Sequence, residues 1–279
     1  MNTKDDTNSV RDSEDENGQH AGGPRCTKKW ILDLFKKEWK LYYRTFELNE
    51  KLYFHYKGFE RIENMHLFPE LKCLYFEGNG IKKIEGLETN VQLVSLYLQE
   101  NLIARIENIH TLSNLHTLQL SDNCITTIDN LSFNSKLDSL YLKSNRLGRN
   151  GVSDLIGLLE CPSIACLDIQ SNNISDVEVL DEVLVKMPKL KVLYMQNNEI
   201  TKKIPSYRKT VIAKIPTLMY LDDRPVFEED RRHAEAFARG GIEAEREERA
   251  IIKREKDEKH QKNHEAFKEM MRKAREEKR

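Results

Sequence analysis

Apolar and polar residues alternate through the middle of the chain in a pattern that repeats every 22 residues. Each copy follows L-x-x-L-x-L-x-x-N-x-I, and its asparagine recurs at intervals of 22, 22, 22, 27 and 26 residues: Asn79, Asn101, Asn123, Asn145, Asn172 and Asn198. A degenerate copy at 52–65 has Lys57 in place of the asparagine, and a last copy breaks off at Asp222. Because one copy cannot bury its apolar face alone, this periodicity predicts a solenoid of stacked coils.

The repeat is typical of leucine-rich repeats and predicts an α/β fold, a solenoid with a parallel inner sheet and convex turns and helices. The L-x-L part of each copy forms a short strand whose apolar side chains point inward. The asparagine ends the strand, where its amide can bond backbone groups that the turn leaves unpaired. The 22-residue copies have room for one short helical turn, whereas the longer copies at 151–163 and 177–189 have room for a helix.

Helical patterns flank the repeats. Residues 28–43 read as an amphipathic helix with four apolar residues on one side: Trp30, Ile31, Leu34 and Phe35. A basic amphipathic helix could lie on a membrane, but a cover for the apolar end of the first coil is the favoured interpretation. After the repeats, a second capping helix is expected to stop at Gly240 and Gly241.

The charged sequence after this stop is rich in acid-first i,i+4 ion pairs such as Glu245–Arg249, which favour an isolated helix. We expect a solvated lone helix, with a docking arm ordered by a partner as the alternative. The predicted organisation is a disordered tail at 1–26, an N-terminal capping helix at 27–47, the solenoid at 48–222, a C-terminal cap at 223–241 and a charged helix at 242–279.

Composition and motifs give no sign of a catalytic, metal-binding or cofactor-binding site. The formal net charge of −1 gives no argument for nucleic acid or a membrane surface, and the five cysteines form no CxxC pair. The eight histidines show no H-E-x-x-H motif, and no phosphate-binding loop or nucleophile elbow occurs. No stretch approaches the roughly 20 apolar residues of a membrane helix, and the start does not resemble a signal peptide. We expect a reduced intracellular protein, not an enzyme, that requires no metal or cofactor.

The concave sheet is the candidate partner-binding surface. The residue between the last two apolar positions of each copy points away from the core. This column consists of five tyrosines and two polar residues: Tyr53, Tyr75, Tyr97, Gln119, Tyr141, Asp168 and Tyr194. Tyrosine suits strands, but it is also enriched at interface hot spots. The next column is polar and nearly neutral, which suits a protein partner better than a phosphate backbone: Glu77, Gln99, Ser121, Lys143, Gln170 and Gln196.

Short segments within the repeats (RIENMH, KIEGLE, RIENIH and TIDNLS) resemble the repeats of protein-phosphatase regulatory subunits. Outside the repeats, TKKWILDLFKKEWKLYYRTF and above all LDDRPVFEEDRRHAEAFARGG, residues 221–241, resemble the family of axonemal dynein assembly factors. This second resemblance covers about residues 27–250. It implies a non-catalytic interaction scaffold for the cytoplasmic preassembly of axonemal dynein arms, located in cytoplasm and cilium.

The expected partners are proteins, namely axonemal dynein chains and assembly co-factors or chaperones, and the chain is expected to be a monomer that binds neither nucleic acid nor membrane. Two alternatives remain open at this stage. A phosphatase regulatory subunit is supported by the repeat type alone. A ribonucleoprotein component would require a basic concave surface, which the two columns lack.

Overall fold

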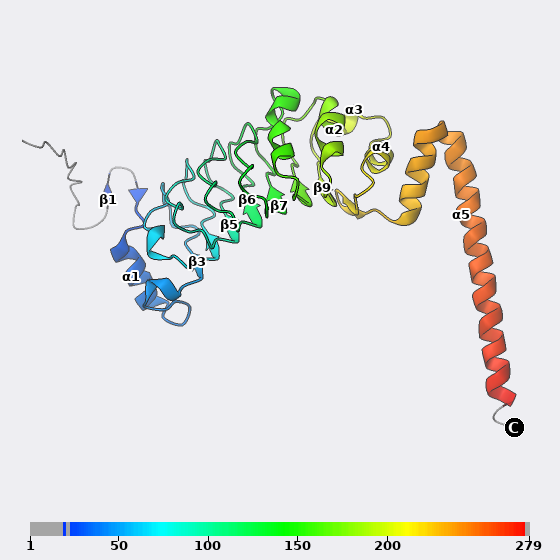
Figure 1. The fold of residues 1–279 in the computed structure, drawn as a ribbon, viewed down its shortest axis with the longest axis horizontal. Coiled ribbons are helices and arrows are strands. Elements are labelled where there is room, and N and C mark those ends of the chain that lie inside the picture. Colours follow the sequence, from blue (N-terminus) through cyan, green and yellow to red (C-terminus); the bar gives the residue numbers. More distant parts are fainter. Residues whose placement is uncertain (1–18, 21–22, 277–279) are drawn as a thin grey trace, which may run out of the picture.

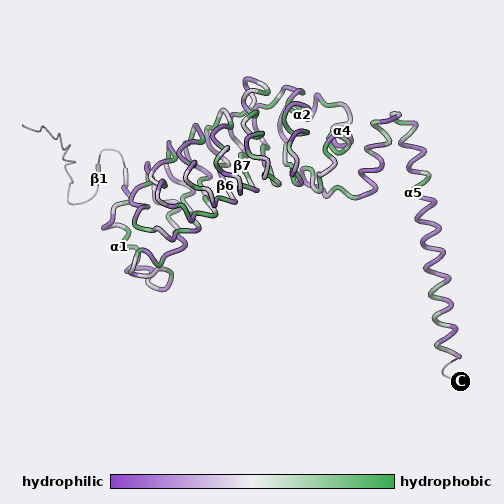
Figure 2. The backbone as a smooth tube through the Cα atoms, viewed as in Figure 1, coloured by the Kyte–Doolittle hydropathy of each residue, from purple (hydrophilic) through white to green (hydrophobic). Residues whose placement is uncertain are grey.

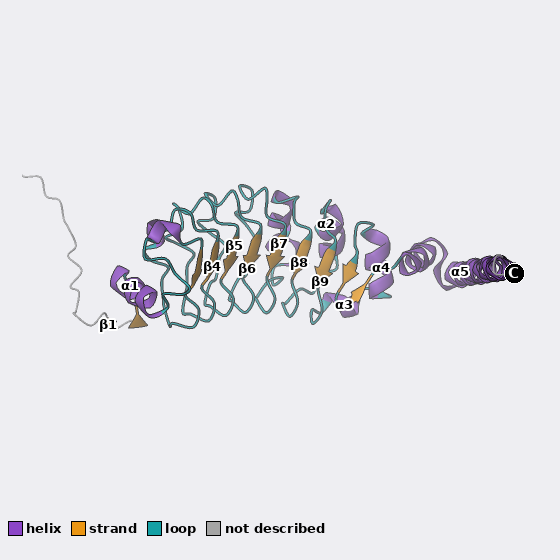
Figure 3. Cartoon of the chain, turned by 90° about the horizontal axis from the view of Figure 1, so that it is seen from below, coloured by secondary structure: helices purple, strands orange, loops and turns teal. Residues whose placement is uncertain are grey.

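The computed structural model describes residues 19–20 and 23–276 and shows a curved solenoid with a helical cap at each end (Figure 1). One nine-stranded sheet lines its inner side (Figure 3), in the order β11-β10-β9-β8-β7-β6-β5-β4-β3. The strands are β3 (Lys51–Tyr53), β4 (Cys73–Tyr75), β5 (Ser95–Tyr97), β6 (Thr117–Gln119), β7 (Ser139–Tyr141), β8 (Cys166–Asp168), β9 (Val192–Tyr194), β10 (Tyr220–Leu221) and β11 (Arg224–Pro225). All pair in parallel except β11, which turns back on β10. The predicted leucine-rich-repeat solenoid is confirmed.

The central residue of each strand from β3 to β9 is a leucine that is completely buried: Leu52, Leu74, Leu96, Leu118, Leu140, Leu167 and Leu193. These leucines lie opposite one another in the strand register, so successive coils stack without a shift. The degenerate first copy contributes fully as well, because Phe54, Phe59 and Met65 have no exposed surface. One continuous core therefore runs from the first coil to the last.

Each asparagine of the repeat bonds to two coils at once. The Asn123 amide nitrogen donates to Leu120 O at 3.1 Å in its own coil and to Leu98 O at 2.9 Å in the preceding one. Its Oδ1 accepts the N–H of Ile103 at 2.9 Å. In the first coil Lys57 stands where the repeat would have its asparagine. The backbone N–H of Lys57 still has an acceptor, because the Asn79 side-chain oxygen of the next coil accepts it. The predicted role of the asparagines is thereby confirmed.

A second polar ladder on the convex side was not predicted from the sequence. The side-chain nitrogens of Asn90 and Asn134 donate to two carbonyls each in the preceding coil, at 2.8–3.0 Å. Both asparagines are completely buried. They hold the convex turns where no sheet hydrogen bonds exist, so the coils are tied together on both sides.

The convex segments of the longer copies are less helical than predicted. Residues 151–163 form two 3₁₀ helices, η3 (Gly151–Asp154) and η4 (Ile156–Glu160), in place of the expected helix. The Asp154 carbonyl accepts the N–H of Ile128 in the preceding coil at 2.8 Å, so it bonds between coils rather than within a regular helix. The next copy has a short α2 (Glu178–Glu182) followed by η5 (Leu184–Lys186).

The N-terminal cap covers the first coil, but its helix is shorter than predicted. Helix α1 (Lys28–Lys37) is capped at its N-terminus by Thr27, whose hydroxyl accepts the N–H of Trp30. Residues 38–43, assigned to this helix from the sequence, instead turn back so that Tyr42 stacks on Phe35 at 4.6 Å. The Asn49 side chain holds the turn: its amide nitrogen donates to the carbonyls of Tyr43, Thr45 and Phe46, and its Oδ1 accepts the N–H of Tyr43. Two 3₁₀ turns, η1 (Phe46–Leu48) and η2 (Met65–Leu67), complete this end.

The tail predicted at 1–26 lies mostly outside the described residues. Within its described part, β1 (Gln19–His20) pairs with β2 (Gly23–Pro24). Cys26 is completely buried, and its carbonyl accepts the Asn64 side-chain N–H at 2.7 Å. Packed structure thus begins before residue 27, because Cys26 fills the space beneath the cap.

The C-terminal cap consists of α3 (Ile200–Lys203), α4 (Tyr207–Lys214) and the kinked α5 (Glu228–Glu276). Gly240 and Gly241 have non-helical backbone angles, as predicted, and divide α5. Residues 242–256, here called the return segment, fold back on 228–239. Arg232 lies 2.6 Å from both Glu248 and Glu255, and Ile252 is 5% exposed.

The prediction of a lone helix from residue 242 is therefore wrong for the return segment. Glu245 is nearly buried between Lys209, at 2.6 Å, and Arg249, at 2.8 Å. The hydrogen bond from Lys209 lowers the pKa of this carboxyl. A lowered carboxyl pKa in the folded state stabilises the hairpin above the ordinary pKa, and this contribution is lost as the pH falls through the lowered value.

Residues 257–276, here called the arm, are mainly hydrophilic (Figure 2), and residues 257–274 and 276 are exposed. Figures 1 and 3 both show the arm projecting from the end of the solenoid on the side of the sheet. No helix in the described part of the chain is long and apolar enough to cross a membrane.

Replacing Arg232 with alanine is expected to open the hairpin without affecting the solenoid. Arg232 is partly exposed and its two ion pairs are screened by solvent, so we expect their loss to weaken the hairpin only modestly. Hydrogen exchange in the return segment should then accelerate about fivefold, with less effect at high salt. The matched control is Arg246→Ala, at an exposed position of the same segment. Equal acceleration in both variants would show that Arg232 does not hold the hairpin.

Candidate partner-binding face

The strand register places the seven predicted residues in one line across the concave sheet. Tyr53 lies opposite Tyr75, which lies opposite Tyr97, and the line continues through four further strands. All seven side chains are half-buried, although the sheet carries no other layer on this side. Neighbours in the same line contribute to this burial, most clearly where Tyr53, Tyr75 and Tyr97 lie against one another.

The five tyrosines do not form one continuous ladder. Tyr53 and Tyr75 stack with ring centroids 4.7 Å apart, and Tyr75 and Tyr97 stack at 4.5 Å with only 4° between the planes. Gln119 ends this three-ring stack, and its side chain accepts the N–H of Ser121 at 3.0 Å. The concave face therefore has a stacked aromatic part at its N-terminal end and a mixed part beyond it.

The mixed part holds Tyr141, Asp168 and Tyr194. The Cys166 thiol lies 3.8 Å from the Tyr141 hydroxyl, and the Asp168 carboxylate accepts the N–H of Gln170 at 3.0 Å. Burial raises the pKa of Tyr75 and of Tyr141 to about 12, so both hydroxyls stay protonated and able to donate near neutral pH. A further tyrosine, Tyr220, was not predicted to belong to this face. Its ring centroid lies 5.8 Å from that of Tyr194.

A further column on this face was also missed. It precedes the central leucine of each strand and carries small side chains at most positions: Cys73, Ser95, Thr117, Ser139, Cys166 and Val192. All six are half-buried. The alternation of the strand could have identified them, because every second residue of a strand points to the same side.

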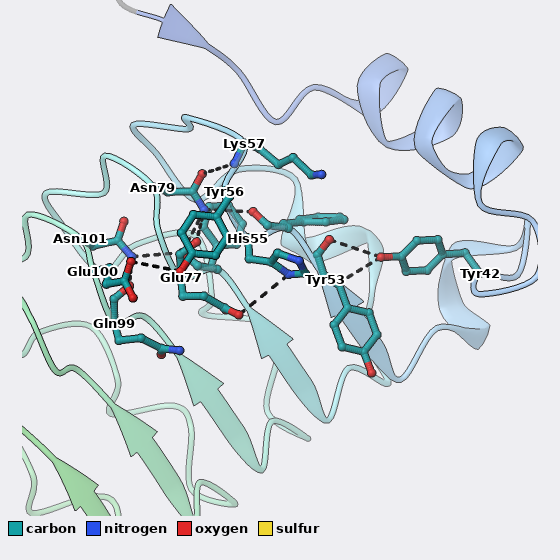
Figure 4. A network of polar contacts seen from close by, with 12 residues as sticks. Tyr42, Tyr53, His55, Tyr56, Lys57, Glu77, Asn79, Gln99, Glu100 and Asn101 are labelled. Atoms are coloured by element: carbon teal, nitrogen blue, oxygen red, sulfur yellow. Dashed lines mark hydrogen bonds and ion pairs between the residues drawn. The ribbon is translucent and has the colours of Figure 1, made fainter.

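The polar column beyond the tyrosines begins at His55, one coil earlier than predicted (Figure 4). His55 Nδ1 lies 3.9 Å from Glu77 Oε1, which is too long for a hydrogen bond. Within the described structure His55 Nδ1, Glu77 Oε2 and Gln99 Oε1 are buried atoms without a hydrogen-bond partner. Three adjacent unsatisfied atoms make this corner the most unusual part of the face.

The ring of Tyr56 spans this corner from the first coil to the third. Its hydroxyl donates to Glu100 Oε2 at 3.1 Å (Figure 4). The ring lies so close to Gly78 that a Cβ added there would be 2.1 Å from it. A side chain at position 78 would therefore displace the ring, which is 62% exposed.

The described residues show no metal-binding cluster, and two of the half-buried or buried cysteines are held as thiols. They contain no group of three histidine, cysteine or acidic residues that could hold a metal ion. The cysteines are free thiols, and burial raises the pKa of Cys161 and Cys166. A thiol held in its protonated form is a weak nucleophile.

Comparisons with known proteins agree with this architecture. A family model described as leucine-rich repeat matches residues 90–251. The chain is 63% identical over 227 residues to dynein axonemal assembly factor 1 of Rattus norvegicus, covering 81% of this chain and 35% of that protein. It is 61% identical over 226 residues to the Homo sapiens protein of the same name, covering 81% and 30%.

Two more distant likenesses complete the comparison. Leucine-rich repeat-containing protein ODA7 of Chlamydomonas reinhardtii is 42% identical over 113 residues, covering 40% of this chain and 26% of that protein. A crystal structure of internalin C2 from Listeria monocytogenes superposes with a TM-score of 0.50 at 22% identity, covering 64% of this chain and 76% of that chain, and supports the fold alone. The chain spans about a third of the length of the mammalian relatives it matches.

Proposed function

Because the chain belongs to the leucine-rich-repeat family and is similar to dynein axonemal assembly factors, we propose that it is a non-catalytic scaffold for axonemal dynein arms. It assists their preassembly in the cytoplasm of ciliated cells by binding dynein chains, or the co-factors and chaperones that fold them. Its partner-binding surface is the concave face, with Tyr53, Tyr75 and Tyr97 as the principal contacts.

The observation that carries this proposal is the three-ring stack. Its rings are held at 4.5–4.7 Å by the strand register, so they are already ordered before a partner arrives. Rigid tyrosines give up little conformational entropy on binding, and tyrosine is enriched among residues that dominate interface energies. The adjacent polar column carries Glu77, Gln99 and Ser121 and has no basic stretch for a phosphate backbone. The face therefore suits a protein partner.

The arm extends the same side of the molecule. Phe267, Met270 and Met271 are 41–57% exposed and lie at the i, i+3 and i+4 positions of a helix, so they share one side of it. The arm projects on the side of the sheet, but from the C-terminal end of the solenoid, opposite the end that carries the three-ring stack. A partner would contact both only if it extended along the whole concave face.

The test is a rescue experiment in ciliated cells from which the gene has been deleted. Wild-type protein should restore dynein arms in axoneme cross-sections and the level of dynein heavy chain in the cytoplasm. The double variant Tyr75→Ser/Tyr97→Ser should restore neither. Its free energy of unfolding should fall by only about 2 kcal/mol, since two ring stacks are lost from an exposed face.

The matched control is Tyr43→Ser, which removes a tyrosine that is 63% exposed on the N-terminal cap. It should rescue fully. Normal arms in cells without the gene would contradict the dynein role. Stoichiometric co-purification of a phosphatase catalytic subunit would then favour a regulatory subunit. Full rescue by the double variant would instead exclude the tyrosine stack as the binding surface.

A further inference from the structure

The carboxylate of Glu77 lies next to the three-ring stack and has no hydrogen-bond donor. Its side chain is only 16% exposed, and within the described structure neither of its oxygens accepts a hydrogen bond. The nearest positively chargeable atom is His55 Nδ1 at 3.9 Å. A buried carboxylate without a donor is unfavourable, so this group is satisfied only when something else supplies one.

The Gln99 amide nitrogen and the His55 ring can donate hydrogen bonds at this corner, but neither donates one to Glu77, and the other groups around Glu77 add acceptors. Gln99 Oε1 in the next coil is buried without a partner. Glu100 accepts the hydroxyl of Tyr56 through one oxygen and carries a second negative charge at the same edge. The corner therefore combines two carboxylates and one amide oxygen beside aromatic rings. Such a set favours a cation that can donate several hydrogen bonds at once.

The glycine beneath Tyr56 shows that this corner is built for the ring. The equivalent positions of the following coils also have positive φ, of 52–59°, yet none is glycine: Glu100, Asp122, Ser144, Ser171 and Asn197. Positive φ alone thus does not explain Gly78. The contact that does is the Tyr56 ring, which would clash with any Cβ there. Tyr56 is 62% exposed, and its hydrogen bond to Glu100 places its ring as one wall of the corner.

We propose that this corner binds an arginine side chain of the protein partner that occupies the concave face. A guanidinium is flat, carries five donors and pairs with a carboxylate through two parallel hydrogen bonds. It would satisfy Glu77 and Gln99 together, and it interacts favourably with the faces of tyrosine rings. This inference rests on the proposed role of the concave face in protein binding, and it names the chemistry by which the partner is recognised.

The inference is tested with a capped Gly-Arg-Gly peptide added to the full chain. Amide chemical shifts of residues 55, 77 and 99 should move and saturate in the millimolar range. The same peptide with citrulline, which has arginine's shape but no charge, should leave them unchanged. A Gly-Lys-Gly peptide should bind at least about threefold more weakly, because an ammonium cannot pair bidentately. Equal binding of the lysine peptide, or no response to arginine, overturns the proposal.

Two variants separate binding from folding. Glu77→Gln should weaken binding of the arginine peptide about tenfold. It should also raise the melting temperature by a few degrees, since it removes a largely buried charge that accepts no hydrogen bond. A merely structural role predicts the opposite sign. The matched control, Asp122→Asn, neutralises an exposed carboxylate on the same side and should change neither value.

Gly78→Ala provides an independent variant, because its methyl group displaces Tyr56. It should weaken binding of the arginine peptide while Glu77 remains in place. If the arginine peptide fails to bind but the double tyrosine variant still fails to support dynein arms, the arginine site is wrong and the proposed function stands. If the peptide binds as described but cells without the gene have normal arms, the site stands and its partner lies elsewhere.

Discussion

Replacing Asn172 with alanine is expected to lower the free energy of unfolding by about 4 kcal/mol. Asn172 is 8% exposed, and its side-chain nitrogen donates to the carbonyls of Leu142, Ile169 and Gln170 at 2.9–3.1 Å. Its Oδ1 accepts the N–H of Leu147 at 3.1 Å. Alanine leaves the Leu147 N–H and most of the three carbonyls without a hydrogen-bond partner. Each fully buried group left in this way costs about 1–3 kcal/mol. Urea unfolding measures the loss directly.

The adjacent residue provides the control. Asn173 has the same side chain but is exposed, so Asn173→Ala should change the free energy of unfolding by less than about 0.5 kcal/mol. Asn172→Asp keeps the acceptor for Leu147 but turns the donor into a second acceptor facing carbonyls. It should therefore be no more stable than the alanine variant. Similar stability of the Asn172→Ala and Asn173→Ala variants would mean that the ladder contributes little.

Phe35→Ala is expected to lower the free energy of unfolding by a comparable amount, about 4 kcal/mol. Phe35 is 1% exposed and its ring lies 4.6 Å from Tyr42, 5.8 Å from Phe46 and 6.0 Å from Phe68. It joins the capping helix, the turn that follows it and the first coil. Its loss creates a cavity where three segments meet, and it also opens the apolar end of the solenoid to water.

Hydrogen exchange locates this effect. Protection should fall in α1 and β3 before it falls in β6, because each coil contacts only its neighbours. The control is Trp39→Ala, which removes a larger ring that is 66% exposed on the same cap. It should leave the unfolding curve nearly unchanged. A uniform loss of protection along all strands would show that the cap does not act on the first coil specifically.

The sequence was sufficient to predict the solenoid, its strand register and the buried leucines, because all three follow from one short periodic pattern. It also placed the breaks at Asp222 and at Gly240–Gly241, where the pattern or the backbone preference changes. It could not show that residues 151–163 form 3₁₀ turns. Contacts between coils accompany these turns, such as the bond between Asp154 O and Ile128 N, which joins residues 26 positions apart.

The return segment was mispredicted for a related reason. Its i,i+4 ion pairs are real, as the pair between Glu245 and Arg249 shows, and they suit an isolated helix equally well. The return segment is held in place by Lys209 and Arg232, which lie in other segments of the chain. Sequence spacing alone could not pair them with Glu245 and Glu248. Local pattern therefore predicts the helix but not where it lies.

The candidate face was predicted in position but not in detail. Alternation along each strand identified the tyrosine column, since it needs only the repeat. The stack stops at three rings because Gln119 follows Tyr97 in the column. The Glu77 oxygen lacks a hydrogen-bond partner because of how side chains from three coils are arranged around it, which a repeat pattern does not reveal. Whether these groups bind a partner remains a prediction of the proposed function.

The asparagine ladder has a consequence for how the protein is made. Each of its inter-coil side-chain bonds reaches back 20–30 residues, for example from Asn123 to Ile103 and from Asn172 to Leu142. A chain leaving the ribosome can therefore close each coil as soon as the next one emerges, starting on a cap that is synthesised first. Until α4 and α5 follow, the newest coil exposes its apolar edge. The growing protein thus needs protection at one moving edge rather than along its whole length.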